Sequence, residues 1–377
     1  MELKGSANLR YRVVLSALTG SPLTVTHIRH KDDYPGLQNS EVNFLELVSK
    51  ITNGTQVTIN QTGTELRFVP GIITNNPSLD TISHNCDKHR GLAYYLEPVI
   101  LIALFGKHSL NLQLRGVSNL PNDLSLDYIQ LVVVPLLKSI GIENVDLKIS
   151  SRGENALVTL KVKPLRKIET PIQLTDTGKI KRVRGIAYSS RINVQMANRV
   201  AYAAKGQLLH FLPDVWIQTD HQKSETPLLG VTLVAETTTK SLLSGEFLRG
   251  EESNFEYLES EVPEDLGTLS VLSLLEELTQ GASIDTGVQC LVLLLMALSA
   301  SQSSVRCARL TPQAIDLMRL IKQVLKVEFK FEDLANPGED EVEEDQYLEE
   351  PLRENLPRNV ILSCTGIAYE NMARIAF

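Results

Sequence analysis

His84, Cys86 and His89 form the pattern H-x-C-x-x-H, a group of potential metal ligands with Asp80 and Asp87 beside it. Imidazole and thiolate groups at short spacing are the ligands that zinc prefers. A structural zinc site normally has four ligands from two such groups, and the sequence contains no second group. We therefore interpret this stretch as a polar surface loop and expect no metal.

Other motifs of catalysis are missing or weak. The sequence has no G-x-x-x-x-G-K-[ST] loop for nucleotide phosphates and no nucleophile elbow. Acidic pairs such as Glu251-Glu252 and Glu276-Glu277 most often lie on solvated faces, and no partner group for acid/base chemistry accompanies them. The residue types alone therefore predict no cofactor.

Composition limits the class of protein. With 377 residues and 43% hydrophobic content, the chain is long enough for two or three domains with a full core. The N-terminal residues MELKGSANLRYR lack an apolar signal region, and the apolar runs are shorter than the roughly 20 residues of a membrane span. The four cysteines are scattered without a C-x-x-C pair. We expect a soluble intracellular protein in a reducing compartment.

The negative charge of the chain is concentrated in one segment. Residues 332–354 hold eleven acidic residues and one basic residue, a local charge of −10, whereas the whole chain has −8. The remainder is therefore slightly basic. Residues 338–354 have too few apolar groups to offset the entropy of ordering, and we expect them to form a solvated acidic loop.

The elements that position these residues recur three times along the chain. Each copy predicts a helix, a strand, a second helix and two further strands, with turn and cap residues between them. The copies cover residues 9–69, 94–162 and 286–364, and Pro135 predicts a kink in the second helix of the middle copy. Residues 184–281 match none of the copies. The predicted fold is α/β (α+β), with core residues 1–183 and 282–377 and one smaller inserted α/β domain at 184–281.

Several motifs in this order resemble the RNA 3′-terminal phosphate cyclase family. They include Pro35-Gly36-Leu37, Tyr95-Leu96-Glu97-Pro98 and LRGVSN at 114–119 in the first two copies. FLPDVWIQTD at 211–220 lies in the inserted domain, and DTGVQCLVLLLMALS at 285–299 lies in the third copy. The resemblance spans nearly the whole chain, and the last of these motifs, with CTGIAYENMARIAF at 364–377, is closest to the eukaryotic cyclase-like branch.

The resemblance implies an enzyme whose nucleophile is missing here. The family's enzymes use ATP to adenylylate a histidine at the start of the helix after the inserted domain, and then activate an RNA 3′-phosphate for attack by the 2′-hydroxyl. Alignment on Met296-Ala297-Leu298 places Gly287 at that position. Glycine has no side chain to hold AMP, and the sequence has no histidine after His221.

Other departures from the family pattern agree with the loss of the nucleophile. Leu3 and Ala7 stand where the enzymes have glutamate and glutamine, and Ser40-Glu41 stand where they have Gln-His. The family signature begins as Arg152-Gly153 but continues without its proline and three glycines. Because those glycines allow close backbone approach to a ligand, we expect neither catalysis nor a nucleotide cofactor.

Basic residues could still serve a binding function. By the resemblance, six arginines lie around loops that face the ancestral cleft, and guanidinium groups can hold phosphates without chemistry. These candidates for anion or RNA binding are Arg10, Arg12, Arg115, Arg152, Arg184 and Arg191. The low aromatic content of 5% argues against a broad base-stacking platform.

A candidate contact for a protein partner lies on the predicted helix 311–325. Helical spacing gathers Leu317, Met318 and Ile321 on one side and leaves Arg319 on the other. An outward arginine on a rigid element suits a charged contact with another protein.

The resemblance as a whole implies a non-catalytic ribosome-assembly factor. Such a protein acts in pre-18S rRNA processing and small-subunit (40S) biogenesis in the nucleus and nucleolus. Its implied partners are a ribosome-biogenesis GTPase and the pre-ribosomal particle, with pre-rRNA as a further contact. The alternative is an RNA-processing enzyme, either a residual cyclase or a pre-rRNA endonuclease. An endonuclease would need two or more carboxylates converging on Mg²⁺.

Overall fold

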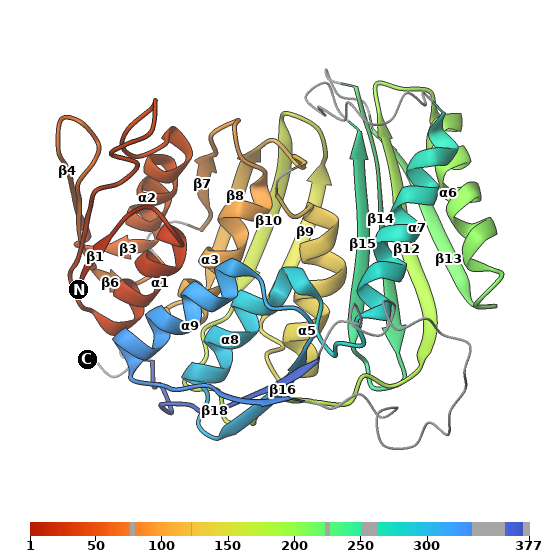
Figure 1. Ribbon diagram of the computed structural model, residues 1–377. Coiled ribbons are helices and arrows are strands. Elements are labelled where there is room, and N and C mark those ends of the chain that lie inside the picture. Colours follow the sequence, from red (N-terminus) through yellow and green to blue (C-terminus); the bar gives the residue numbers. More distant parts are fainter. Residues whose placement is uncertain (76–79, 122, 223–226, 250–261, 334–358, 372–377) are drawn as a thin grey trace.

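The computed structural model describes residues 1–75, 80–121, 123–222, 227–249, 262–333 and 359–371 (Figure 1). The acidic loop expected at 338–354 lies outside these residues. Three helix-and-sheet units form one body, and a fourth sheet with its own helices lies beside them at the right of Figure 1. Within the described ranges, the helices are too short or too polar to cross a membrane.

The three units share one topology, which confirms the α/β prediction. In each sheet the first two strands are parallel and the other two are antiparallel to their neighbours. The strand orders are β1-β2-β5-β4, β7-β8-β10-β9 and β11-β16-β18-β17. The first strand of each unit was not predicted from the sequence.

The bounds of the first two units follow the predicted order of elements. The first unit consists of β1 (Glu2–Lys4), α1 (Leu9–Thr19), β2 (Leu23–Thr26), α2 (Asn39–Ile51), β4 (Gln56–Ile59) and β5 (Leu66–Val69), with a small side sheet of β3 (Thr52–Asn53) and β6 (Ile72–Ile73). The second unit consists of β7 (Ile82–Asn85), α3 (Leu92–Leu104), β8 (Leu110–Gly116), α4 (Leu126–Tyr128), η1 (Ile129–Val133), α5 (Val134–Ser139), β9 (Val145–Ser151) and β10 (Ala156–Val162).

The third unit is interrupted after its first strand. It consists of β11 (Gln173–Leu174), η2 (Thr286–Val288), α8 (Gln289–Leu298), β16 (Gln302–Cys307), α9 (Pro312–Leu325), β17 (Lys330–Asp333) and β18 (Val360–Thr365). The inserted domain therefore lies between β11 and α8, inside the third unit, and not between complete units as the sequence suggested.

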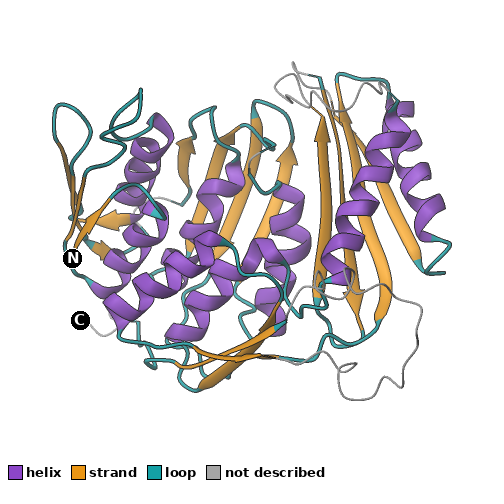
Figure 2. Cartoon of the chain, viewed as in Figure 1, coloured by secondary structure: helices purple, strands orange, loops and turns teal. Residues whose placement is uncertain are grey.

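The inserted domain is one sheet with two helices on the same face (Figure 2). Its elements are β12 (Ile180–Ser190), α6 (Val194–Leu208), β13 (Val215–Gln222), β14 (Leu228–Thr237), β15 (Leu242–Arg249) and α7 (Pro263–Thr279), in the sheet order β13-β12-β14-β15. The strand β12 runs across residue 184, where the sequence placed the domain border. Strands β12 and β15 were not predicted.

Burial explains why the central helices form. Every residue of α3 and of α8 is buried, as expected for helices packed on all sides within the core. Helix α9 is amphipathic, and the apolar side predicted for it is buried at Leu317, Met318 and Ile321. The inserted domain has its own smaller apolar cluster between its sheet and α6 and α7.

The segment before Pro135 has an irregular backbone that positions Tyr128. Ser125 caps its start as predicted, because its Oγ accepts a hydrogen bond of 2.9 Å from the Tyr128 N–H. Pro135 has no N–H to continue the ordinary α-helical bonding, and the chain forms the π-helical turn η1 just before it. Tyr128 therefore lies at the junction of α4 and η1.

Candidate functional site at the junction of core and inserted domain

Asp285 joins three parts of the molecule. Its carboxylate is buried and accepts four hydrogen bonds. Two come from the Ser244 N–H and hydroxyl of β15, at 2.7 and 2.8 Å. The others come from the Tyr128 hydroxyl at 2.6 Å and the Gly287 N–H at 2.8 Å. The second unit, the inserted domain and the start of the α8 segment are therefore bonded to one side chain.

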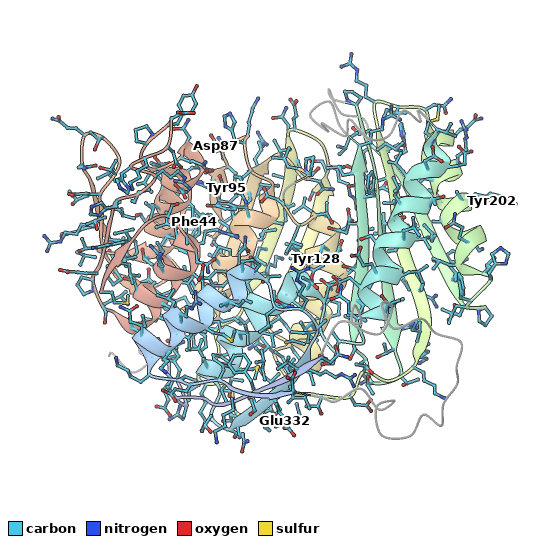
Figure 3. All side chains as sticks on the ribbon, viewed as in Figure 1. Phe44, Asp87, Tyr95, Tyr128, Tyr202 and Glu332 are labelled. Carbon is cyan, nitrogen blue, oxygen red and sulfur yellow. The ribbon has the colours of Figure 1, made fainter. Side chains whose placement is uncertain are left out.

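The space beside Gly287 is filled. A Cβ atom at residue 287 would lie 2.6 Å from Tyr128 Oη, 2.9 Å from Tyr128 Cζ and 3.0 Å from Leu124 Cδ2. Real Cβ atoms essentially never approach other atoms as closely as the first two distances. Burial, and then the neighbouring Asp285, raises the pKa of Tyr128 well above its ordinary value, so its hydroxyl stays a donor. Figure 3 labels Tyr128 near the border with the inserted domain.

Arg152 forms a second buried link across the same junction. Its guanidinium donates to both oxygens of Asp127, at 2.6 and 3.1 Å, and to Asp220 of β13. Asp127 is fully buried, and the Arg152 side chain is 7% exposed. The backbone N–H of Arg152 also donates to Gln222 at 2.6 Å. Arg152 thus holds the second unit against β13, and each of its three guanidinium nitrogens donates to a carboxylate of the chain.

A small cavity of about 180 Å³ opens at this junction. It is lined in part by Asn119, Asp123, Tyr188 and Glu246. The Glu246 carboxylate accepts hydrogen bonds from both hydroxyls near it, those of Ser125 and Thr232. Burial raises the pKa of Glu246 to about 7, because the charged form loses its water there.

The potential metal ligands at 84–89, which we interpreted as a polar surface loop, are divided between the interior and the surface. His84 is buried in β7, 3.0 Å from both Lys50 Nζ and Asn43 Oδ1. Burial, and then Lys50, lowers its pKa to about 4. His89 is exposed and contacts Asp87. The interpretation as a polar surface loop was therefore wrong for His84 and for the buried Cys86, and no group of three or more possible ligands for a metal is found in the described part of the chain.

The six arginines expected around the cleft have different environments. Arg10 donates to the Tyr94 carbonyl at 2.7 Å and to Glu97 at 3.4 Å, whereas Arg12 donates to the carbonyls of Lys4 and Gly5. Arg152 is the buried link described above. Of the remaining three, Arg115 is exposed on β8, Arg184 pairs with Asp214 on the inserted domain, and Arg191 is exposed just after β12.

The Tyr94 ring is contacted by two guanidinium groups, those of Arg10 and Arg90. The guanidinium carbons of Arg10 and Arg90 each lie 4.1 Å from the centre of the Tyr94 ring. Arg90 also pairs with Asp123, which lines the cavity at the junction. Sequence reasoning missed Arg90 and Tyr94, because neither stands in a motif and only the fold brings them together.

Arg319 occupies the outward face of α9, as the helical spacing predicted. Its side chain is 76% exposed, and its guanidinium lies 3.0 Å from Asp316, one turn earlier on the same helix. Such an exposed pair contributes little to stability, so Arg319 is able to exchange this contact for another.

We predict that Arg152→Ala destabilises the protein by about 3–5 kcal/mol, because Asp127 would remain buried without its partner. Chemical unfolding measures the change. The matched control is Arg199→Ala, since Arg199 pairs with Glu264 in the same bidentate manner but at the surface. The control should change stability little. Equal effects of the two substitutions would contradict a structural role for the buried link.

We also predict that Glu246 makes stability depend on pH. Its pKa is raised in the folded state, so folding favours its protonated form, and stability should fall as pH rises from about 5 to about 7. Glu246→Gln should flatten this decline when unfolding is measured across the range. Part of the slope should remain, because burial also raises the pKa of Glu277 to about 6. An unchanged slope in the variant would show that Glu246 is not the group involved.

Comparison with known proteins agrees with this architecture. The family description RNA 3′-terminal phosphate cyclase matches residues 1–331. An RNA 3′-terminal phosphate cyclase-like protein of Mus musculus is 40% identical over 376 residues, covering 97% of this chain and 95% of the mouse protein. A probable cyclase-like protein of Dictyostelium discoideum is 38% identical over the full length of both chains. The rRNA processing protein rcl1 of Schizosaccharomyces pombe is 32% identical and covers 88% of this chain and 92% of its own. The chain therefore belongs to the RNA 3′-terminal phosphate cyclase family.

Proposed function

We propose that this family member is not a cyclase and acts as a binding subunit. The observation that carries the proposal is the environment of Gly287, which by the resemblance corresponds to the adenylylated residue of the family's enzymes. Glycine offers no nucleophile, and the Tyr128 hydroxyl fills the space that a side chain would need. The Asp285 carboxylate beside it is fully used in holding the junction together.

The process in which the protein acts is pre-18S rRNA processing and small-subunit (40S) biogenesis. The name of the Schizosaccharomyces pombe relative, rRNA processing protein rcl1, supports this assignment. In this proposal the protein works in the nucleolus, within the pre-ribosomal particle. A ribosome-biogenesis GTPase is its direct partner, and pre-rRNA is a second contact.

The six arginines are not equally suited to contact RNA phosphates. Arg10 and Arg152 have carboxylate partners in the interior, so we propose them as supports for the fold around the cleft. Arg12 donates to carbonyls close to its own helix. Arg115, Arg184 and Arg191 lie nearer to solvent and are the better candidates for phosphate contacts.

An endonuclease is not favoured as a second function. Metal-assisted cleavage needs carboxylates that converge on a cation. Asp127 and Asp220 do converge, but on Arg152, and Asp285 accepts hydrogen bonds from four donors. These carboxylates are therefore committed to contacts within the chain.

We predict that the purified protein forms no covalent adenylate with labelled ATP and no cyclic phosphate on an RNA that ends in a 3′-phosphate. An active cyclase of the family serves as the positive control. Gly287→His should also stay unlabelled and should unfold at a lower denaturant concentration than the wild type, because Tyr128 occupies the space for the new side chain. A labelled wild-type protein would end the proposal.

We predict that Arg319→Ala lowers the recovery of the GTPase in a pull-down from nucleolar extract, while the unfolding curve stays that of the wild type. The loss of an exposed charged contact mainly affects association with the partner. Arg199→Ala is the control, since Arg199 is a similarly exposed and ion-paired arginine on the inserted domain. If wild type and both variants recover no GTPase, the partner assignment is wrong.

A further inference from the structure

The two faces of the inserted sheet have different environments. Helices α6 and α7 cover one face, which includes Val183 and Val215 in a buried cluster. Alternation along the strands directs Arg184 and Trp216 to the opposite face. These two residues are also direct neighbours in the parallel register of β12 and β13.

The core closes only part of this opposite face. On β15, Ser244 bonds to Asp285 and Glu246 bonds to Ser125, so this edge is sealed against the second and third units. On β13, at the other edge, Trp216 is 64% exposed and Gln218 is also exposed. An open strip therefore follows β12 and β13. We call this strip, with Trp216 and Arg184, the open face; Lys181 lies at its end, at the register shift of β12 and close to Asp214.

Trp216 is an unusual residue to leave in water. It is the only tryptophan of the chain, and its indole presents a flat apolar ring with no helix or core element over it in the described ranges. Burial of an aromatic ring of this size is strongly favourable, so an exposed one suits a partner that covers it.

The surroundings of Trp216 are basic. The Arg184 side chain next to it is 36% exposed and lies 2.8 Å from Asp214. The hydrogen bond from Arg184, with Arg182 and Lys181 also close, lowers the pKa of Asp214. The cations at this end of the sheet are Lys179, Lys181, Arg182, Arg184 and Lys240, and the carboxylates near them are Asp176, Asp214 and Glu236. Cations outnumber acids, so the open face suits an anionic partner.

A flat ring next to a row of cations matches one ligand class best. Single-stranded RNA offers unpaired bases that stack on aromatic rings, and a phosphate chain that runs along basic side chains. A duplex keeps its bases stacked inside and would present only phosphates to the indole. An acidic protein segment would pair with the cations but would leave the ring without its preferred planar partner.

We propose that the open face binds single-stranded RNA, with one base stacked on Trp216 and adjacent phosphates on Lys181 and Arg184. The inference rests on the proposed function in one respect, since it supposes that RNA is among the contacts. It adds a site on the inserted domain, away from the junction at Asp285. The low aromatic content of the chain is compatible with it, because one ring is enough for one base.

The test uses the full chain and an unstructured uridine-rich RNA oligonucleotide. Because Trp216 is the only tryptophan, its fluorescence reports directly on the site, and we expect RNA to quench it. In anisotropy measurements with labelled RNA, Trp216→Ala should weaken binding roughly tenfold, and Trp216→Phe should retain most of the affinity. Lys181→Gln should reduce the salt dependence of binding by about one charge. A duplex of the same length should bind more weakly and quench less.

The matched control is Tyr202→Ala. Tyr202 is 82% exposed on α6, on the helix side of the sheet, and Figure 3 labels it at the outer edge of the inserted domain. This variant should bind RNA like the wild type. Both variants should unfold like the wild type, because both side chains are exposed.

Three results would overturn the inference. The RNA site would lie elsewhere if RNA bound without quenching the Trp216 fluorescence, or if it bound Trp216→Ala as tightly as the wild type. A Trp216→Ala variant that loses a protein partner but keeps its RNA affinity would make the open face a protein interface. If the wild type binds no RNA at all, the inference fails while recovery of the GTPase still supports the proposed function.

Discussion

The four hydrogen bonds to Asp285 hold together parts of the chain that are far apart in sequence. One carboxylate receives donors from Tyr128, Ser244 and Gly287, which belong to the second unit, the inserted domain and the start of the α8 segment. A buried carboxylate is costly unless its lone pairs are satisfied, and here they are. The same bonds place the Tyr128 ring against Gly287. The arrangement that stabilises the junction therefore also fills the space beside Gly287, the residue that we propose stands in place of the nucleophile.

Other buried polar contacts also join the core to the inserted domain. The ion pairs of Arg152 with Asp127 and Asp220 connect the core to β13, and Glu246 on β15 bonds to Ser125 of the second unit. Polar groups that could serve an active site are used here to fix one domain on another. The contacts with partners that we propose lie away from this junction, at the exposed Arg319 on α9 and the exposed Trp216 on the inserted sheet.

Much of the fold could be predicted from the sequence, because helices with a 3.6-residue period and strands next to turn residues leave clear patterns. Strands β1, β7 and β11 were missed, since they have two to four residues and no room for a pattern. Strand β12 was also missed, because its first residues are mostly polar and lack the pattern of a strand. In the site, the family resemblance led to the expectation that Gly287 stands in place of the nucleophile. The position of the Tyr128 side chain beside Gly287 could not be predicted, because the two residues meet only through the tertiary fold and the irregular turn before Pro135.

Amide hydrogen exchange at the Asp285 junction tests the central claim most directly. The N–H groups of Ser244 and Gly287 both donate to this buried carboxylate, so peptides that contain them should exchange slowly. The account predicts that ATP and Mg²⁺ leave these rates unchanged, because the junction is closed and offers no acceptor for AMP. Rapid exchange in the free protein, or a change in these peptides when ATP is added, would contradict it.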